Sequence, residues 1–310
     1  MTWADITFWF RIYDHTIATA LISSIAALSM YVSLRAGLFN LSAVGFMALG
    51  AYTAGIIALR FGTPSAVGIA AGIVSSVIIG LCLVLPILRL KGHYLAIATL
   101  SFAAIVQALA LNLDSLTNGP GGLIGIPATV QVWHLALVLG VVIYGTYVMQ
   151  QSRTGRAWDA IRTNEAAARS LGINVERYRL LAFLISTMLA ALAGGLWAHV
   201  NRVIVPFEFG FGQLTMILVD TLLGGISHPL GPVLGALIVS TMPDWLHQFE
   251  QYREAIIGSI LVLIVIYLPN GLVPPIAAAA HWARRRIGGD RVAPPPYKAA
   301  AESPRPGSAV

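Results

Sequence analysis

Long apolar runs separated by short polar connections occupy most of the chain. A helix that crosses a bilayer needs about 20 mainly apolar residues. The pattern therefore predicts an all-α polytopic membrane protein with about eight to nine transmembrane helices. The candidate spans are residues 16–34, 38–59, 66–88, 94–112, 132–149, 180–200, 213–227, 230–245 and 255–270.

Glycine and proline interrupt the apolar stretch 213–245. Gly224 and Gly225 precede Pro229, and further glycines and a proline follow. Backbone that leaves helical geometry at membrane depth is tolerated only where protein or a water-filled cavity covers it. This stretch is therefore predicted to form either two short spans or a re-entrant pair. It is also a candidate lining of a translocation pathway.

The composition supports a membrane protein and argues against several other classes. Charged residues make up 10% of the chain and apolar residues 57%, whereas soluble domains carry about 25% charged residues. The net charge of +6 is spread over the edges of the apolar runs, so no nucleic-acid partner is expected. The single cysteine, Cys82, builds neither a disulfide nor a zinc site by itself, so no metal site is expected.

The distribution of Lys and Arg predicts the orientation in the membrane, because cytoplasmic loops carry an excess of these residues. The charged segment 152–179 is placed in the cytoplasm. Fifteen of the 19 Lys and Arg residues then fall inside, and the other four fall outside. The N-terminus is therefore predicted outside and the C-terminus inside, whether or not 213–245 is re-entrant. The four outer residues are Arg11, Arg60, Arg202 and Arg253.

The composition changes abruptly after Ala283. Residues 284–310 are rich in Pro, Ala, Gly and charge without periodicity, which is typical of a disordered tail. The arginines at 284–286 are expected to bind anionic lipid headgroups. The predicted organisation is a transmembrane domain over 1–283 and a basic, Pro-rich cytoplasmic tail over 284–310.

The charged segment 152–179 is predicted to fold as two short helices, with Gly155 and Gly172 bracketing the helical part. Asn164 is a plausible N-cap for the second helix. An alanine run then leads to Gly172, which is typical of the C′ position where helices end. Asn174 is expected to cap the helix that enters the membrane.

The two short helices are predicted to present a small apolar face with an arginine rim. Such a face suits docking into a groove on a soluble partner. The alternative is a solvated loop whose arginines only set the orientation. The candidate docking residues are Gly155, Arg156, Trp158, Ile161, Glu165, Ala166, Ala167, Leu171 and Gly172.

Polar side chains within the apolar runs are candidates for a translocation pathway. Asp220 is the only acid in the interior of a predicted span. A charge at the bilayer centre costs at least about 2.5 kcal/mol and is functional by default. The alternative role for all of these groups is hydrogen bonding between packed helices. The candidate pathway residues are Asn40, Ser42, Gln107, Asn112, Asp220, Gly224 and Gly225.

Short sequence blocks in a characteristic order cover most of the chain. They are GAYT at 50–53, LKGHYLAIATL at 90–100, DSLT at 114–117, GPGGL at 119–123, GIP at 125–127, SR and GRA within 152–157, AA at 166–167, LGIN at 171–174, LLAF at 180–183, GG at 224–225, GPVLGA at 231–236 and LPNGL at 268–272. Together they resemble the permeases of ATP-binding-cassette (ABC) importers, and most closely the LivM-type permeases of the branched-chain amino acid uptake family.

The resemblance implies an importer permease of the bacterial inner membrane that carries branched-chain or related amino acids. The implied partners are a LivH-type sister permease, two ATPase subunits that dock on the charged segment, and a periplasmic solute-binding protein. No cofactor is expected on this chain. It lacks a Walker A motif, so the ATPase subunits are expected to hydrolyse the ATP.

Two other functions remain open. Some permeases of the same family carry urea or short amides, so the solute is not determined. An ion-coupled secondary transporter with Asp220 as its coupling acid belongs to a different class, although no internal repeat is evident. An enzyme is not expected, because the chain lacks the H-E-x-x-H and G-x-S-x-G signatures and paired aspartates in its spans.

Overall fold

The computed structural model describes residues 3–87, 90, 92–245 and 258, all within one compact unit, Met1–Pro274. Three predictions lie outside these residues: the span 255–270 apart from Gly258, the domain boundary at 283 and the tail 284–310.

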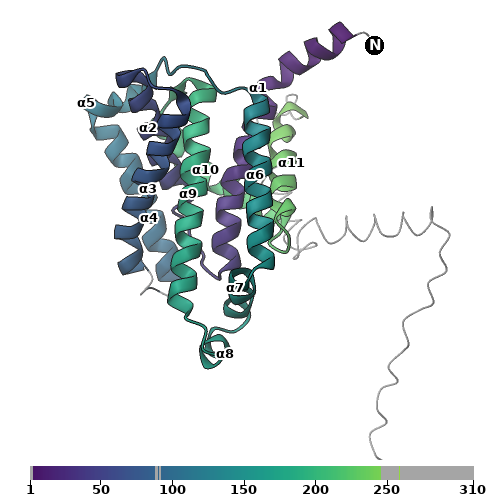
Figure 1. Ribbon diagram of the computed structural model, residues 1–310. Helices are drawn as coiled ribbons and strands as arrows, with labels where there is room; N and C mark the ends of the chain where they lie inside the picture. The colour runs from purple at the N-terminus through teal and green to yellow at the C-terminus, as the bar shows by residue number, and fades with distance from the viewer. Residues whose placement is uncertain (1–2, 88–89, 91, 246–257, 259–310) are drawn as a thin grey trace, which may run out of the picture. The chain divides into compact units, whose positions relative to one another are not determined.

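Six helices of the described chain are long and apolar enough to cross a membrane (Figure 1). They confirm the first six predicted spans. Each begins and ends near the predicted limits, except that the first helix starts well before residue 16. The six are α1 (Trp3–Arg35), α2 (Ala43–Phe61), α3 (Ser65–Ile87), α4 (His93–Asn112), α6 (Val132–Gln151) and α9 (Val175–Asn201).

α1 lies at the centre of the described part. Within Asp14–Arg35 of α1, 78% of the most apolar 18-residue stretch is buried. The equivalent stretches of α3, α4 and α6 are only 22–33% buried. α1 packs against α9, α6 and the two helices that follow α9. The peripheral helices α3, α4 and α6 expose apolar side chains such as Val74, Ile97 and Val141, as expected for surfaces that face lipid.

α2, α3 and α9 pack with their backbones in close approach. A Cβ atom built on Gly50 would collide with the backbone of Ala191, and one on Gly194 would collide with the backbone of Met47. Small residues at such crossings let membrane helices gain dispersion and polar contacts that larger side chains would block. This interface fixes α9, whose first turn carries the contacts of the charged segment.

Two shorter apolar helices follow, α10 (Phe211–Gly224) and α11 (Leu230–Trp245). At 1.5 Å per residue, their 14 and 16 residues extend about 21 and 24 Å, less than the roughly 30 Å of a bilayer core. They pack on each other and on α1. The predicted pair of short helices in this stretch is therefore present.

The two ends of the helix bundle differ in their connections (Figure 1). At one end lie α7 (Arg153–Thr163) and α8 (Glu165–Ser170). At the other end, β1 pairs antiparallel with β2, with Leu123 opposite Ile204. The short elements of that end are α5 (Asp114–Thr117), η1 (Gly119–Gly121), β1 (Leu123–Ile124), β2 (Val203–Ile204) and η2 (Pro206–Phe209).

Candidate functional site

The apolar side of α7 is attached to α9. Trp158 is 3% exposed, and its indole Nε1 donates a hydrogen bond to the Tyr178 carbonyl oxygen at 2.9 Å. Ile161 packs with Ala168 and Val175 in a separate small apolar cluster. The structure thus places Trp158 and Ile161 against the protein's own helix. Their burial leaves them unavailable to a docking partner in this arrangement.

Gly155 lies within the first turn of α7 instead of preceding the helix. α7 begins at Arg153, and its N-cap Ser152 accepts a hydrogen bond from the Thr154 backbone N–H at 3.2 Å. A Cβ atom at Gly155 would collide with the Gln150 backbone at the end of α6. Gly155 therefore allows the sharp change of direction from α6 into α7.

α8 has the caps predicted from the sequence. Asn164 accepts a hydrogen bond from the Ala167 backbone N–H, and Asn174 caps α9 in the same way. Gly172 follows α8 with φ of +78°, a left-handed conformation that favours glycine. Both predicted caps and the predicted C′ glycine are confirmed.

The outer face of α8 is open. Ala166, Ala167 and Gly172 are exposed, as is Arg156 on α7. Leu171 is 78% exposed, more than any other large apolar side chain in the described chain. The predicted docking residues thus divide into a buried group and an exposed group, and the exposed group lies mainly on α8.

Glu165 links α8 to α9 through two arginines. Its carboxylate lies 3.0 Å from the guanidinium of Arg169 on the same helix and 2.9 Å from that of Arg179 on α9. Burial opposes the charge on Glu165. The hydrogen bonds and positive charges of Arg169 and Arg179 outweigh burial and lower the pKa of the carboxyl group. Glu165 is therefore ionised and holds α8 in place at neutral pH.

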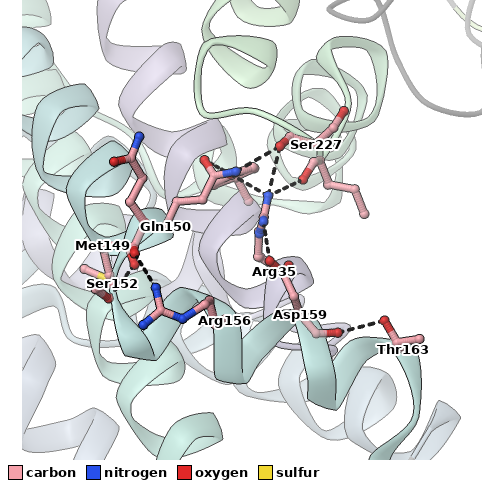
Figure 2. A network of polar contacts seen from close by, with 11 residues as sticks. Arg35, Met149, Gln150, Ser152, Arg156, Asp159, Thr163 and Ser227 are labelled. Carbon is pink, nitrogen blue, oxygen red and sulfur yellow. Dashed lines mark hydrogen bonds and ion pairs between the residues drawn. The ribbon is translucent and has the colours of Figure 1, made fainter. Parts of the chain in front are cut away.

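A polar network around Arg35, at the end of α1, joins α6, α7 and the turn between α10 and α11 (Figure 2). The Arg35 Nη2 donates to Asp159 Oδ2 on α7 at 2.8 Å, and its Nη1 donates to the Ser227 carbonyl oxygen at 2.9 Å. Gln150 at the end of α6 donates to the same carbonyl at 3.1 Å. Sequence reasoning counted Arg35 only as a topology signal. The sole hint of its role was its place in the last turn of an apolar helix.

His228 lies in the turn between α10 and α11, beside this network. Burial, and then the positive charge of Arg35, lower the pKa of the imidazole. His228 is therefore neutral at neutral pH, and Arg35 carries the positive charge here.

The predicted pathway residues Asn40 and Ser42 lie just before α2, instead of within the second span. Both are buried, and the Asn40 Oδ1 accepts a hydrogen bond from the Ser42 hydroxyl at 2.6 Å. The neighbouring Leu41 backbone N–H donates to the Thr99 hydroxyl on α4 at 3.0 Å. These hydrogen bonds fix the conformation of the segment that leads into α2.

Gln107 and Asn112 on α4 bond to backbone. The Gln107 side chain donates to the Pro206 carbonyl oxygen at 3.2 Å, and the Asn112 side chain donates to the Ala108 carbonyl oxygen at 2.7 Å. Neither forms a hydrogen bond with another candidate pathway residue in the described chain. The structure does not gather these polar groups into one site.

Asp220 is 2% exposed on α10, and its Oδ1 has no hydrogen-bond partner among the described residues. The backbone beside it is packed tightly, because a Cβ atom at Gly235 would collide with the Asp220 carbonyl. A Cβ atom on Gly224 would likewise collide with the Gly231 backbone. Gly224 and Gly225 thus belong to the close contact between α10 and α11.

The opposite end of the described part also has an opening. A cleft of about 660 Å³ lies there, lined in part by Asp14, Gln131, Trp133 and Arg202. No group of three or more His, Cys, Asp or Glu residues in the described ranges is arranged to hold a metal ion.

Comparisons with known proteins identify relatives of the chain. The curated LivM proteins of the high-affinity branched-chain amino acid transport systems of Salmonella typhimurium and Escherichia coli are 33% and 31% identical to it. Each alignment covers 77% of this chain and 64% of the relative, so the chain spans under two thirds of their length. The LivH permease protein of Salmonella typhimurium is 30% identical over 130 residues, which are 41% of this chain and 42% of LivH.

No solved structure matches the chain. The family model for the branched-chain amino acid transport system permease component matches residues 12–266, which include every described helix after the first turns of α1. The chain therefore belongs to the family of branched-chain amino acid transport system permease components.

Proposed function

We propose that the chain is the permease subunit of an ABC importer for branched-chain or related amino acids. The observation that carries the proposal is the exposed face of α8, where small side chains lead to Leu171, in a chain of this permease family. An exposed apolar surface outside the spans is typical of a site that binds a protein partner or the membrane. In an importer, that partner is the ATPase.

The energy comes from partner subunits in this proposal. Two ATPase subunits bind and hydrolyse ATP, and a LivH-type sister permease completes the pathway. A periplasmic binding protein delivers the solute. LivM and LivH proteins both match this chain and are named as permeases of branched-chain amino acid transport systems, which supports a paired arrangement.

The orientation proposed is that the end with α7 and α8 faces the cytoplasm of a bacterial inner membrane, with the N-terminus outside. Arg35 and the six arginines of segment 152–179 lie in the helix ends and short helices of that end, whereas Arg60 and Arg202 lie at the other. This asymmetry follows the positive-inside rule. α10 and α11 form a short-helix pair next to α1, either re-entrant or as two spans of an eight- to nine-helix protein.

Replacing Ala167 with Glu tests the docking proposal. Ala167 is exposed, so the fold should survive. A carboxylate at the docking face should reduce co-purification of the ATPase subunits and uptake together, since charge at the core of an interface opposes binding. Ala128→Glu, an exposed alanine at the opposite end, is the matched control for ATPase binding. Undiminished ATPase binding and uptake in Ala167→Glu would contradict the proposal.

Asp220 allows a second candidate function, ion-coupled transport, because its buried Oδ1 lacks a partner among the described residues. Asp220→Asn removes the charge and keeps the shape. If transport depends on ATP and not on an ion gradient, and Asp220→Asn leaves that dependence unchanged, ion coupling is excluded. Uptake assays with leucine, and with urea in parallel, also distinguish amino acid import from urea import.

A further inference from the structure

Arg35 bonds to two separate elements at the end of the bundle that carries α7 and α8 (Figure 2). One side of its guanidinium meets the Asp159 carboxylate on α7 at 2.8 Å. The other side donates to the carbonyl oxygens of Ser227 and Ile226, at 2.9 and 3.3 Å, in the turn between α10 and α11. The planar guanidinium can make both contacts at once, so it links the two elements.

α7 uses different sides for its two attachments. Trp158 packs toward α9, and the adjacent Asp159 reaches Arg35. Neighbouring residues on a helix point about 100° apart, which allows one helix to hold both elements. The Arg35 side chain is 10% exposed and that of Asp159 is 44% exposed. An ion pair open to water on one side exchanges at small cost, whereas the apolar attachment to α9 does not.

The turn that accepts from Arg35 joins two helices, α10 and α11, that are packed closely against each other. Gly231 contacts the backbones of Gly224 and Gly225, and Gly235 contacts that of Asp220. Direct backbone contact leaves no side chains between the helices that would absorb a displacement. A shift of the turn at Ser227 would therefore also displace the backbone at the buried Asp220.

We propose that Arg35 is a positioning residue that carries movement of α7 to the α10–α11 hairpin and so couples ATPase docking to the transport pathway. This rests on the proposed function, in which the ATPase docks on the exposed face of α8, directly after α7 in the chain. Gln150 supports the same turn by donating to the Ser227 carbonyl oxygen from α6. That bond comes from α6 and not from α7, so we expect it to remain when the Arg35 contact is broken.

The test is Arg35→Lys in the complete importer, reconstituted in proteoliposomes with its ATPases and binding protein. A lysine ammonium keeps the charge but cannot span the carboxylate and the carbonyls as a planar fork does. The expected result is normal ATPase association and ATP hydrolysis, with leucine uptake per ATP lower by about 2- to 30-fold, the range for residues on a coupling path. Arg60→Lys is the matched control, because Arg60 also donates from the last turn of its helix to a carbonyl, that of Ser115 at 2.9 Å, at the opposite end.

A second variant and a second measurement keep the test decisive if Arg35→Lys folds poorly. Asp159→Asn removes only the ion pair and should lower uptake per ATP in the same direction. Leu230→Cys in a Cys82→Ser background reports movement of the turn through its rate of maleimide labelling. That rate should change on addition of ATP when Arg35 is intact, and the change should be lost when Arg35→Lys or Asp159→Asn is added.

The outcomes separate this inference from the proposed function. If the wild-type chain does not bind the ATPases, the proposed function fails. If it binds them and transports leucine, but Arg35→Lys and Asp159→Asn both keep the wild-type uptake per ATP and the ATP-dependent labelling, the role of Arg35 is overturned.

Discussion

The two short helices of the charged segment, α7 and α8, follow each other in the sequence and are used in opposite ways. α7 buries its apolar side, with Trp158 and Ile161 each 3% exposed. α8 is only six residues long and leaves Leu171 78% exposed at its end. The difference places an anchor beside an exposed surface: α7 fixes the segment to α9, and α8 presents the side chains that we propose as the contact surface.

The largest effect is expected where the anchor is removed. Trp158→Ala deletes a buried aromatic ring and the hydrogen bond to the Tyr178 carbonyl oxygen. Such substitutions cost about 3–5 kcal/mol, so the thermal midpoint in detergent should fall by several degrees or the protein should fail to fold. Trp158→Phe keeps most of the packing and should fall in between. An unchanged midpoint for Trp158→Ala would mean that α7 is not anchored by this contact.

A substitution on the exposed face of α8 should instead lower ATPase binding and leave stability unchanged. Leu171→Ala changes a side chain with few contacts inside the protein, so stability should stay within about 0.5 kcal/mol of wild type. Affinity for the ATPase should fall about tenfold if Leu171 is an interface anchor, and a binding assay with the purified ATPase measures this. A loss of stability with intact ATPase affinity would reverse the assignment of anchor and surface.

In α7 and α8, the helix caps could be predicted from neighbouring residues in the sequence. Which side chains are buried depends on tertiary contacts and could not. Asn164, Asn174 and Gly172 follow capping rules that depend on residues within one turn, and all three occupy the predicted positions. Which apolar residue faces inward depends on α9, and the spacing within α7 and α8 contains no information about it. Trp158 and Leu171 were therefore predicted together as docking residues, although the structure separates them.

The network around Arg35 shows the same limit of sequence reasoning over longer distances. Arg35 bonds to a residue 124 positions away and to another 192 positions away. A single arginine at a helix end has many possible partners, and composition alone counts it as a topology signal. The candidate pathway residues Asn40 and Gln107 are buried and partly buried, but they bond locally or to backbone and do not form one cluster.

The bracketing glycines provide a smaller, matched comparison. Gly172 has φ of +78°, and a Cβ atom added there would have no neighbour within 4 Å among the described residues. Gly172→Ala therefore meets only backbone strain, about 1 kcal/mol. Gly155→Ala meets the Gln150 backbone directly and should cost more, about 1–3 kcal/mol. The thermal midpoints of the two variants should show that Gly155→Ala destabilises the protein more than Gly172→Ala does. Equal midpoints would show that the α6–α7 junction relaxes freely.

The smallest effect concerns the ion pairs that hold α8 to α9. The lowered pKa of Glu165 means that its carboxylate stabilises the folded state above the ordinary Glu pKa of about 4.3. That stability is lost as the pH falls through the lower, folded-state pKa, because the carboxyl group is then protonated in both states. Glu165→Gln should therefore melt below wild type at pH 7, and the gap should close as the pH falls through the folded-state pKa of Glu165.

Glu176→Gln is the matched control for this pH dependence. Glu176 lies 3.8 Å from Arg169 and its side chain is 70% exposed, whereas that of Glu165 is 28% exposed and contacts two arginines. A single solvent-exposed pair contributes little, so Glu176→Gln should match wild type at every pH. If both variants show the same gap, the effect reflects the net charge of the segment. A gap confined to Glu165→Gln shows that this carboxylate holds α8 against α9, and thereby keeps Leu171 in its exposed position.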